Sequence, residues 1–106
     1  MSLSKLANDF HEVAVSKGFW DGEYGYDKVG NKLALIHSEV TEVLEAIRKD
    51  KGSEEIVTEM ADIVIRLLDL YAAMKEHGEI THDLDVIIEE KNKVNKERAK
   101  LHGNKF

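Results

Sequence analysis

Helical spacing of apolar residues, uninterrupted by proline, is the feature that most constrains how this chain folds. The sequence contains no proline, and strand-like alternation of apolar and polar residues is scarce. Capping side chains at the start and glycine at the end delimit four expected helices, at about 2–17, 28–49, 53–78 and 81–103. The expected N-terminal caps are Ser2 or Ser4, Asp27, Ser53 and Thr81. The sequence therefore predicts an all-α fold.

The third expected helix, 53–78, predicts that the bundle is completed by another subunit. Ile65, Leu68 and Leu70 widen its main apolar face until apolar residues occupy most of its circumference. A helix that is apolar on nearly every side is a buried one. The 106 residues correspond to a single domain, 1–106, and a domain of this size leaves much apolar surface uncovered. We therefore expect a four-helix bundle completed by oligomerisation, most simply as a two-fold dimer.

Composition argues against several classes of protein. The formal net charge is −6, whereas nucleic-acid binding usually requires a basic surface. Cysteine is absent, so neither disulfides nor thiolate metal sites are expected. The N-terminal segment lacks the apolar core of a signal peptide, and no segment approaches the ~18 apolar residues of a membrane span. We expect a soluble, cytoplasmic protein with no membrane or nucleic-acid partner.

Two matched pairs of acidic residues carry the strongest chemical signal. Glu39 and Glu42 lie within the second expected helix, and Glu59 and Asp62 lie within the third. Residues three apart are neighbours on a helix surface, and a short turn between the two helices brings the pairs to similar heights in an antiparallel hairpin. Clustered carboxylates repel one another, and hard cations such as Mg²⁺ relieve that repulsion. The pairs therefore predict a metal site, although each pair alone is a weak signal.

The end of the fourth expected helix leaves two interpretations open. Lys91, Asn95, Arg98 and His102 continue the direction of an apolar face that begins at Leu84. A polar line in that place indicates that the helix end closes over an anionic ligand. Alternatively, neighbouring apolar residues carry the packing, and the polar line is solvated surface.

The connection 18–27 is rich in aromatic residues and glycine, with Phe19, Trp20, Tyr24 and Tyr26 in close succession. Such a loop either stacks on a nucleobase or covers the end of a helical bundle, and the residues alone favour the second interpretation. His11, His37 and His77 are expected to be surface or packing residues rather than metal ligands.

The chain resembles the MazG-like, all-α nucleoside triphosphate pyrophosphohydrolases over nearly its whole length. The resemblance rests on the two acidic pairs and on the C-terminal segment KNKVNKERAKLHGNKF, which is similar to the family's Lys-x-x-x-Asn-x-x-Arg motif with a trailing His-Gly. The segment KGFWD before the second expected helix also fits the family.

The resemblance implies an enzyme that hydrolyses a nucleoside triphosphate, or its deoxy form, to the monophosphate and pyrophosphate with Mg²⁺. A role in cleansing the nucleotide pool would follow. The metal ligands would be Glu39, Glu42, Glu59 and Asp62, and either Glu39 or Glu42 would activate water. The phosphate contacts would come from Lys91, Asn95 and Arg98, and Trp20 would border the base or sugar. The family also implies a homodimer or a dimer of dimers, with sites built across subunits.

Two alternatives remain open at the level of sequence. One is phosphoribosyl-ATP pyrophosphohydrolase, a relative with a similar bundle. The other belongs to a different class, a non-catalytic helical dimer whose acidic residues form a structural cation site.

Overall fold

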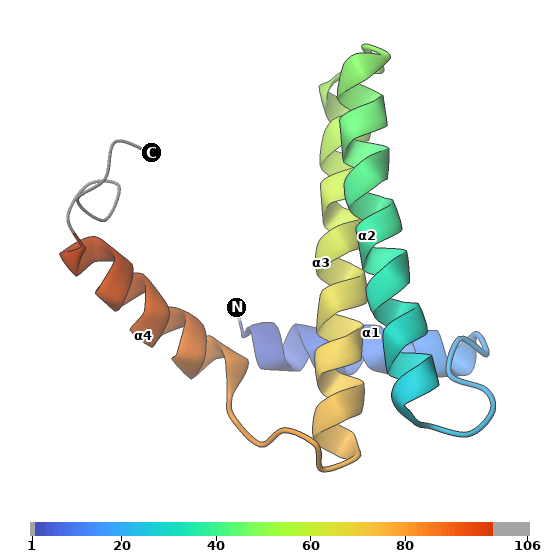
Figure 1. The fold of residues 1–106 in the computed structure, drawn as a ribbon, viewed down its shortest axis with the longest axis vertical. Helices are drawn as coiled ribbons and strands as arrows, with labels where there is room; N and C mark the ends of the chain where they lie inside the picture. The colour runs from blue at the N-terminus through green and yellow to red at the C-terminus, as the bar shows by residue number, and fades with distance from the viewer. Residues whose placement is uncertain (1, 99–106) are drawn as a thin grey trace.

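Residues 2–98 are described by a computed structural model, in which four α-helices and no strands occur (Figure 1). The helices are α1 (Leu3–Ser16), α2 (Tyr26–Arg48), α3 (Ser53–Glu76) and α4 (Leu84–Glu97). The predicted all-α fold is therefore confirmed. Within this part of the chain, no helix sustains the apolar length that crossing a bilayer requires.

Helices α2 and α3 form a long antiparallel hairpin (Figure 1). The turn between them contains Asp50 and Gly52, whose backbones adopt φ angles of 52° and 95°. Glycine is favoured at such an angle because it has no Cβ to clash with the backbone. The tight reversal brings the middle of α2 beside the middle of α3, as the sequence predicts.

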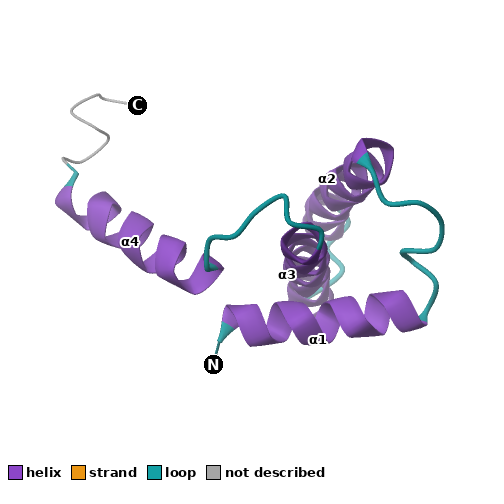
Figure 2. Cartoon of the chain, turned by 90° about the horizontal axis from the view of Figure 1, so that it is seen from below, coloured by secondary structure: helices purple, strands orange, loops and turns teal. Residues whose placement is uncertain are grey.

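Helix α3 is the central element, since both α1 and α2 pack on it (Figures 1 and 2). The α1 helix crosses the C-terminal half of α3, and the core there consists of Ala7, Leu68 and Ala72. Small residues at this crossing allow the two helices to approach closely. The half-buried side chains around this core are Leu3, Leu6, Phe10, Tyr71 and Leu84.

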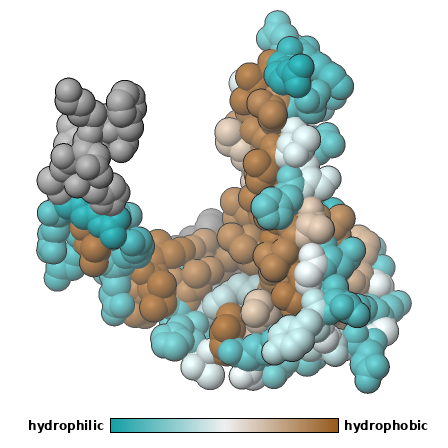
Figure 3. Space-filling view, in the orientation of Figure 1, coloured by the Kyte–Doolittle hydropathy of each residue, from teal (hydrophilic) through white to brown (hydrophobic). Residues whose placement is uncertain are grey.

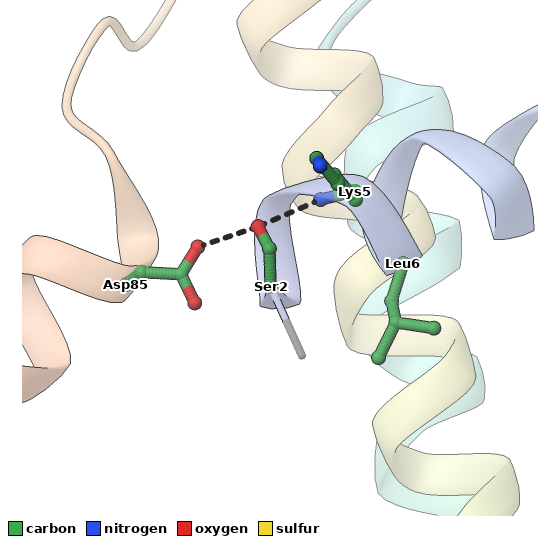
Figure 4. Close-up of a pocket in the computed structure, with 4 residues that line it drawn as sticks. All are labelled: Ser2, Lys5, Leu6 and Asp85. Carbon is green, nitrogen blue, oxygen red and sulfur yellow. Dashed lines mark hydrogen bonds between the residues drawn. The ribbon is translucent and has the colours of Figure 1, made fainter.

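Helix α4 packs on α1, touches α3 through Leu84 at its first residue, and projects to the side of the α2–α3 hairpin (Figures 1 and 2). Asp85 connects α4 to α1. Its carboxylate accepts hydrogen bonds from the backbone N–H groups of Leu3 at 2.8 Å and Ser4 at 3.1 Å. Ser2 donates to the same carboxylate and accepts from the N–H of Lys5 (Figure 4). The backbone hydrogen bonds lower the pKa of Asp85 below its ordinary value. One carboxylate thus satisfies two of the free N–H groups at the start of α1.

The helix starts agree with the predicted caps only in part. Ser2 caps α1 as predicted, but α2 begins after Gly25 and places Asp27 in its first turn. Ser53 is the first residue of α3 rather than its cap. The predicted cap at Thr81 is wrong, because Asp83 accepts from two backbone N–H groups at the start of α4. A carboxylate satisfies such donors at least as well as a hydroxyl.

A large apolar surface remains uncovered along the hairpin (Figure 3). The chain exposes 8066 Å², whereas a monomeric globular protein of this mass exposes about 6,000 Å². Its radius of gyration is 16.4 Å, compared with about 13 Å for a compact domain of this length. The half-exposed apolar side chains include Val40, Leu44 and Ile47 of α2 and Met60, Val64 and Leu67 of α3. A single chain therefore buries far less of its apolar surface than a compact monomer does.

Candidate metal centre and adjoining cavity

Three of the four predicted metal ligands meet between α2 and α3. Glu39 of α2 and Glu59 and Asp62 of α3 each offer a carboxylate oxygen, and the three oxygens lie within 4.8 Å of one another. Glu59 and Asp62 are neighbours because they are three residues apart on one helix. Glu39 reaches them because α2 runs antiparallel beside α3. We call Glu39, Glu59 and Asp62 the acidic cluster.

Glu42, the fourth predicted ligand, lies outside this cluster and is exposed. It still acts on the cluster through its charge. The pKa of Glu59 is raised above its ordinary value of 4.5, first by desolvation and then by the charges of Asp62, Glu42 and Glu39. Both effects disfavour the ionised carboxylate. The site therefore holds more negative charge than its surroundings stabilise.

Arg66 provides part of the missing positive charge. Its Nε donates to Oε1 of Glu39 at 3.0 Å, across the α2–α3 interface. Arg66 lies one helical turn beyond Asp62, so it projects from the same side of α3. Arg66 was not among the site residues predicted from the sequence, although its spacing of four from Asp62 is a usable signal for an ion-pair partner.

A cavity of about 240 Å³ opens beside the acidic cluster. Its apolar walls come from α1, the following loop and α3, and its polar groups include two members of the cluster. The lining residues are Phe10, Val13, Ala14, Phe19, Glu39, Asp62, Ile65, Arg66 and Asp69. An apolar pocket with a few convergent polar groups is the usual form of a small-molecule site.

Trp20, the predicted base or sugar contact, is held against α3 and does not line this cavity. Its Nε1 donates to the carboxylate of Asp69, at 2.9 Å to Oδ1 and 3.1 Å to Oδ2. Lys32 lies over the indole, with Nζ 4.7 Å from the ring centroid, and also donates to the carbonyl oxygen of Phe19. Phe19, rather than Trp20, lines the cavity.

The remaining aromatic contacts of the loop support the packing interpretation. Tyr24 stacks on His77, with ring centroids 3.7 Å apart, and lies 6.1 Å from the Trp20 ring. The Tyr24 hydroxyl donates to Glu79. Burial first, and the neighbouring Glu79 carboxylate second, raise the pKa of Tyr24 from 10.0 to about 12. These contacts tie the loop to the C-terminal end of α3.

The predicted phosphate contacts lie apart from the acidic cluster. Lys91 and Asn95 are exposed on α4, and exposed Arg98 is its C-terminal cap. Helix α4 meets α3 at its first residue, Leu84, whose N–H donates to the hydroxyl of Tyr71 at 3.0 Å, and then projects to the side of the hairpin (Figure 1). The structure therefore does not bring these residues to the cluster of the same chain. His102 lies outside the described residues.

The residues of the acidic cluster fit a hard divalent cation better than any other ligand. All three donors are carboxylate oxygens, which suit Mg²⁺ and Ca²⁺. No histidine joins the cluster within residues 2–98. Desolvation first, and then the neighbouring carboxylates, raise the pKa of Glu59, and a bound cation would favour its ionised form.

Comparisons with protein-family models, with curated proteins and with solved structures find no match to this chain. The likeness to MazG-like enzymes therefore rests on the motifs in the sequence.

Proposed function

We propose that this protein is a Mg²⁺-dependent pyrophosphohydrolase that converts a nucleoside or deoxynucleoside triphosphate to the monophosphate and pyrophosphate. The observation that carries this function is the acidic cluster on two facing helices, directly beside an apolar cavity. The cluster supplies the ligands for a cation that binds phosphates, and the cavity offers a place for the nucleoside end. Removal of unwanted nucleotides from the pool is the role that such an activity suits.

The chemistry follows from the side chains present. Glu39, Glu59 and Asp62, with Glu42 nearby, would hold Mg²⁺, which when bound neutralises phosphate charge and lowers the pKa of water. Glu39 or Glu42 accepts the proton of the attacking water. The water oxygen bonds to phosphorus as the bond between the α- and β-phosphates breaks, and pyrophosphate leaves. No covalent intermediate with the protein is needed.

A second copy of the chain is part of this proposal. The chain exposes about 2,000 Å² more surface than a compact monomer of its mass. Over two chains this amounts to about 4,000 Å², which is within the range of obligate homodimer interfaces. Lys91, Asn95 and Arg98 would then reach the phosphates bound at the acidic cluster of the other subunit. Cationic side chains stabilise the charge that develops during phosphoryl transfer.

A second candidate function, which one specific observation favours, is a structural cation site in a protein that catalyses no reaction. Arg66 already pairs with Glu39 at 3.0 Å, as in an ordinary ion-pair network between helices. Such a protein binds Mg²⁺ but releases no product.

A product assay distinguishes these functions. The protein is incubated with Mg²⁺ and a panel of canonical and damaged nucleoside triphosphates, with phosphoribosyl-ATP included, and pyrophosphate is resolved from orthophosphate. We expect pyrophosphate and a monophosphate in equal amounts from at least one class. Glu59→Gln abolishes this release, whereas the matched control Glu54→Gln, at an exposed position in the first turn of α3, retains it. Release of orthophosphate, or no release from any member, contradicts the proposal.

A further inference from the structure

Asp69 is the only buried charged residue among residues 2–98, with 8% of its surface exposed. A buried carboxylate is costly unless hydrogen bonds compensate the loss of water. Asp69 meets that requirement with two ring nitrogens: the Nε1–H of Trp20 donates to its Oδ1 at 2.9 Å, and Nδ1 of His11 lies 2.8 Å from the same oxygen. These rings come from the loop after α1 and from α1 itself, so one carboxylate on α3 holds two separate segments.

The position of Asp69 connects this hydrogen-bond network to the cavity. Asp69 lies on the same face of α3 as Asp62, two helical turns further on, and it lines the cavity together with Phe19. Phe19 directly precedes Trp20 in the chain, and its side chain is 59% exposed. The backbone N–H of Phe19 donates to the carbonyl oxygen of Ala14 at 3.0 Å, and the anchored Trp20 holds the chain directly after it.

We infer that Asp69 is a positioning residue: by holding the indole of Trp20, it sets the aromatic wall that Phe19 forms at the ligand cavity. Lys32 supports the same arrangement from α2, because it donates to the Phe19 carbonyl and covers the indole face. The wall is therefore held from two helices that also carry the acidic cluster. Through this wall, Asp69 governs the affinity for the nucleoside part of the substrate rather than the chemical step. This last role rests on the proposed function.

Three variants test this role. Asp69→Asn keeps the side-chain shape but removes the negative charge and one of the two oxygens that Nε1 of Trp20 contacts. Trp20→Phe keeps an aromatic ring but removes the N–H. The matched control is Glu76→Gln, because Glu76 contacts the other ring nitrogen of His11 at 2.9 Å but is 64% exposed and does not line the cavity.

The kinetic readout separates affinity from chemistry. A hydrogen bond to a charged group stabilises by enough to change an equilibrium constant about 10-fold or more. We expect Asp69→Asn and Trp20→Phe each to raise KM about 10-fold, with kcat changed less than about twofold, and the double variant to be no worse than either single one. Glu76→Gln leaves KM unchanged. Equal effects of Glu76→Gln and Asp69→Asn, additive effects in the double variant, or a loss confined to kcat would overturn the inference.

A second readout does not require turnover. Trp20 is the only tryptophan, so the protein gives a single indole N–H resonance. We expect that N–H to exchange slowly with solvent in the wild-type protein and in Glu76→Gln, and much faster in Asp69→Asn. Unchanged exchange in Asp69→Asn overturns the positioning role. If the exchange result is as expected while no nucleotide is hydrolysed, the proposed function fails but Asp69 still positions the loop.

Discussion

The guanidinium of Arg66 donates from Nε to Oε1 of Glu39 at 3.0 Å, from the middle of α3 to the middle of α2. This ion pair places a positive charge next to three carboxylates whose oxygens lie within 4.8 Å of one another. Arg66 and a divalent cation would compete for Glu39, since a carboxylate oxygen that accepts from a guanidinium is less available to a metal. The same arginine also lines the adjoining cavity, where it can contact an anionic part of a ligand.

Replacing Arg66 with glutamine is therefore expected to strengthen Mg²⁺ binding. The Arg66 side chain is 39% exposed, so its ion pair contributes on the order of 0.2–1 kcal/mol. Loss of the competing charge corresponds to an increase of up to about 5-fold in Mg²⁺ affinity, measured by titration calorimetry. Without Mg²⁺, the variant melts at a lower temperature than the wild-type protein because the acidic cluster loses its counter-charge.

The control for this prediction is Arg48→Gln. Arg48 pairs with Glu45 at 3.2 Å on the exposed surface of α2 and lies outside the acidic cluster. This variant removes the same formal charge from the protein as Arg66→Gln does. Equal Mg²⁺ affinities of the two variants would mean that Arg66 does not compete for Glu39.

The hairpin and its acidic cluster were predictable from the sequence because they depend on local rules. Helical spacing places Glu59 and Asp62 side by side, and a short turn with glycine returns the chain so that Glu39 faces them. The position of Glu42 was less predictable. It is only three residues from Glu39, but the rotation of α2 against α3 leaves it exposed.

The role of Asp69 could not be predicted from helical spacing or turn residues alone. In sequence it is one more acidic residue on a long helix, and nothing nearby in the chain marks it as the acceptor for Trp20 and His11. That role depends on how α1 crosses α3, which is a matter of tertiary packing. The usable signal was its setting, a carboxylate flanked by Leu68 and Leu70, where an acidic side chain requires hydrogen-bond partners.

Glu59 is expected to make stability depend on pH when Mg²⁺ is absent. Its pKa is raised in the folded protein above the ordinary 4.5, so the folded state retains a proton that the unfolded state has lost. Stability therefore falls as pH rises from about 4.5 through the folded-state pKa. In EDTA at pH 7, Glu59→Gln should melt at a higher temperature than the wild-type protein, and this advantage should vanish below pH 4.

We expect Mg²⁺ to reverse the order of the melting temperatures of the wild-type protein and Glu59→Gln. A ligand that binds only the folded state stabilises that state by mass action, and the wild-type cluster has one carboxylate more than the variant. Thermal melts across pH, with and without Mg²⁺, measure both effects. A constant difference between wild-type and Glu59→Gln at every pH would contradict the electrostatic origin of the raised pKa.

Tyr24 is expected to ionise at a higher pH than an ordinary tyrosine. Burial and the neighbouring Glu79 carboxylate raise its pKa to about 12. An ultraviolet titration of the phenolate band should show one of the three tyrosines ionising at that pH. Glu79→Gln should bring this late step to a lower pH because it removes the negative charge but keeps the acceptor. A titration with no late step would mean that the loop does not pack on α3 in solution.

The uncovered apolar stripe of α3 is expected to form the subunit interface. Met60, Val64 and Leu67 are each about half exposed, and their spacing of four and three places them on one face of the helix. Val64→Glu would bury a charge at the centre of such an interface, at a cost of several kcal/mol unless it finds a partner. We expect wild-type protein to sediment as a dimer or larger species at micromolar concentration and Val64→Glu to sediment as a monomer.

Val15→Glu is the matched control, because Val15 is equally exposed at 49% but lies on α1. This variant should keep the wild-type sedimentation coefficient. Because the proposed phosphate contacts come from α4 of another subunit, Val64→Glu should also lose pyrophosphate release, with Mg²⁺ binding at the acidic cluster retained. A monomeric Val64→Glu protein with full activity would show that one chain completes the site alone.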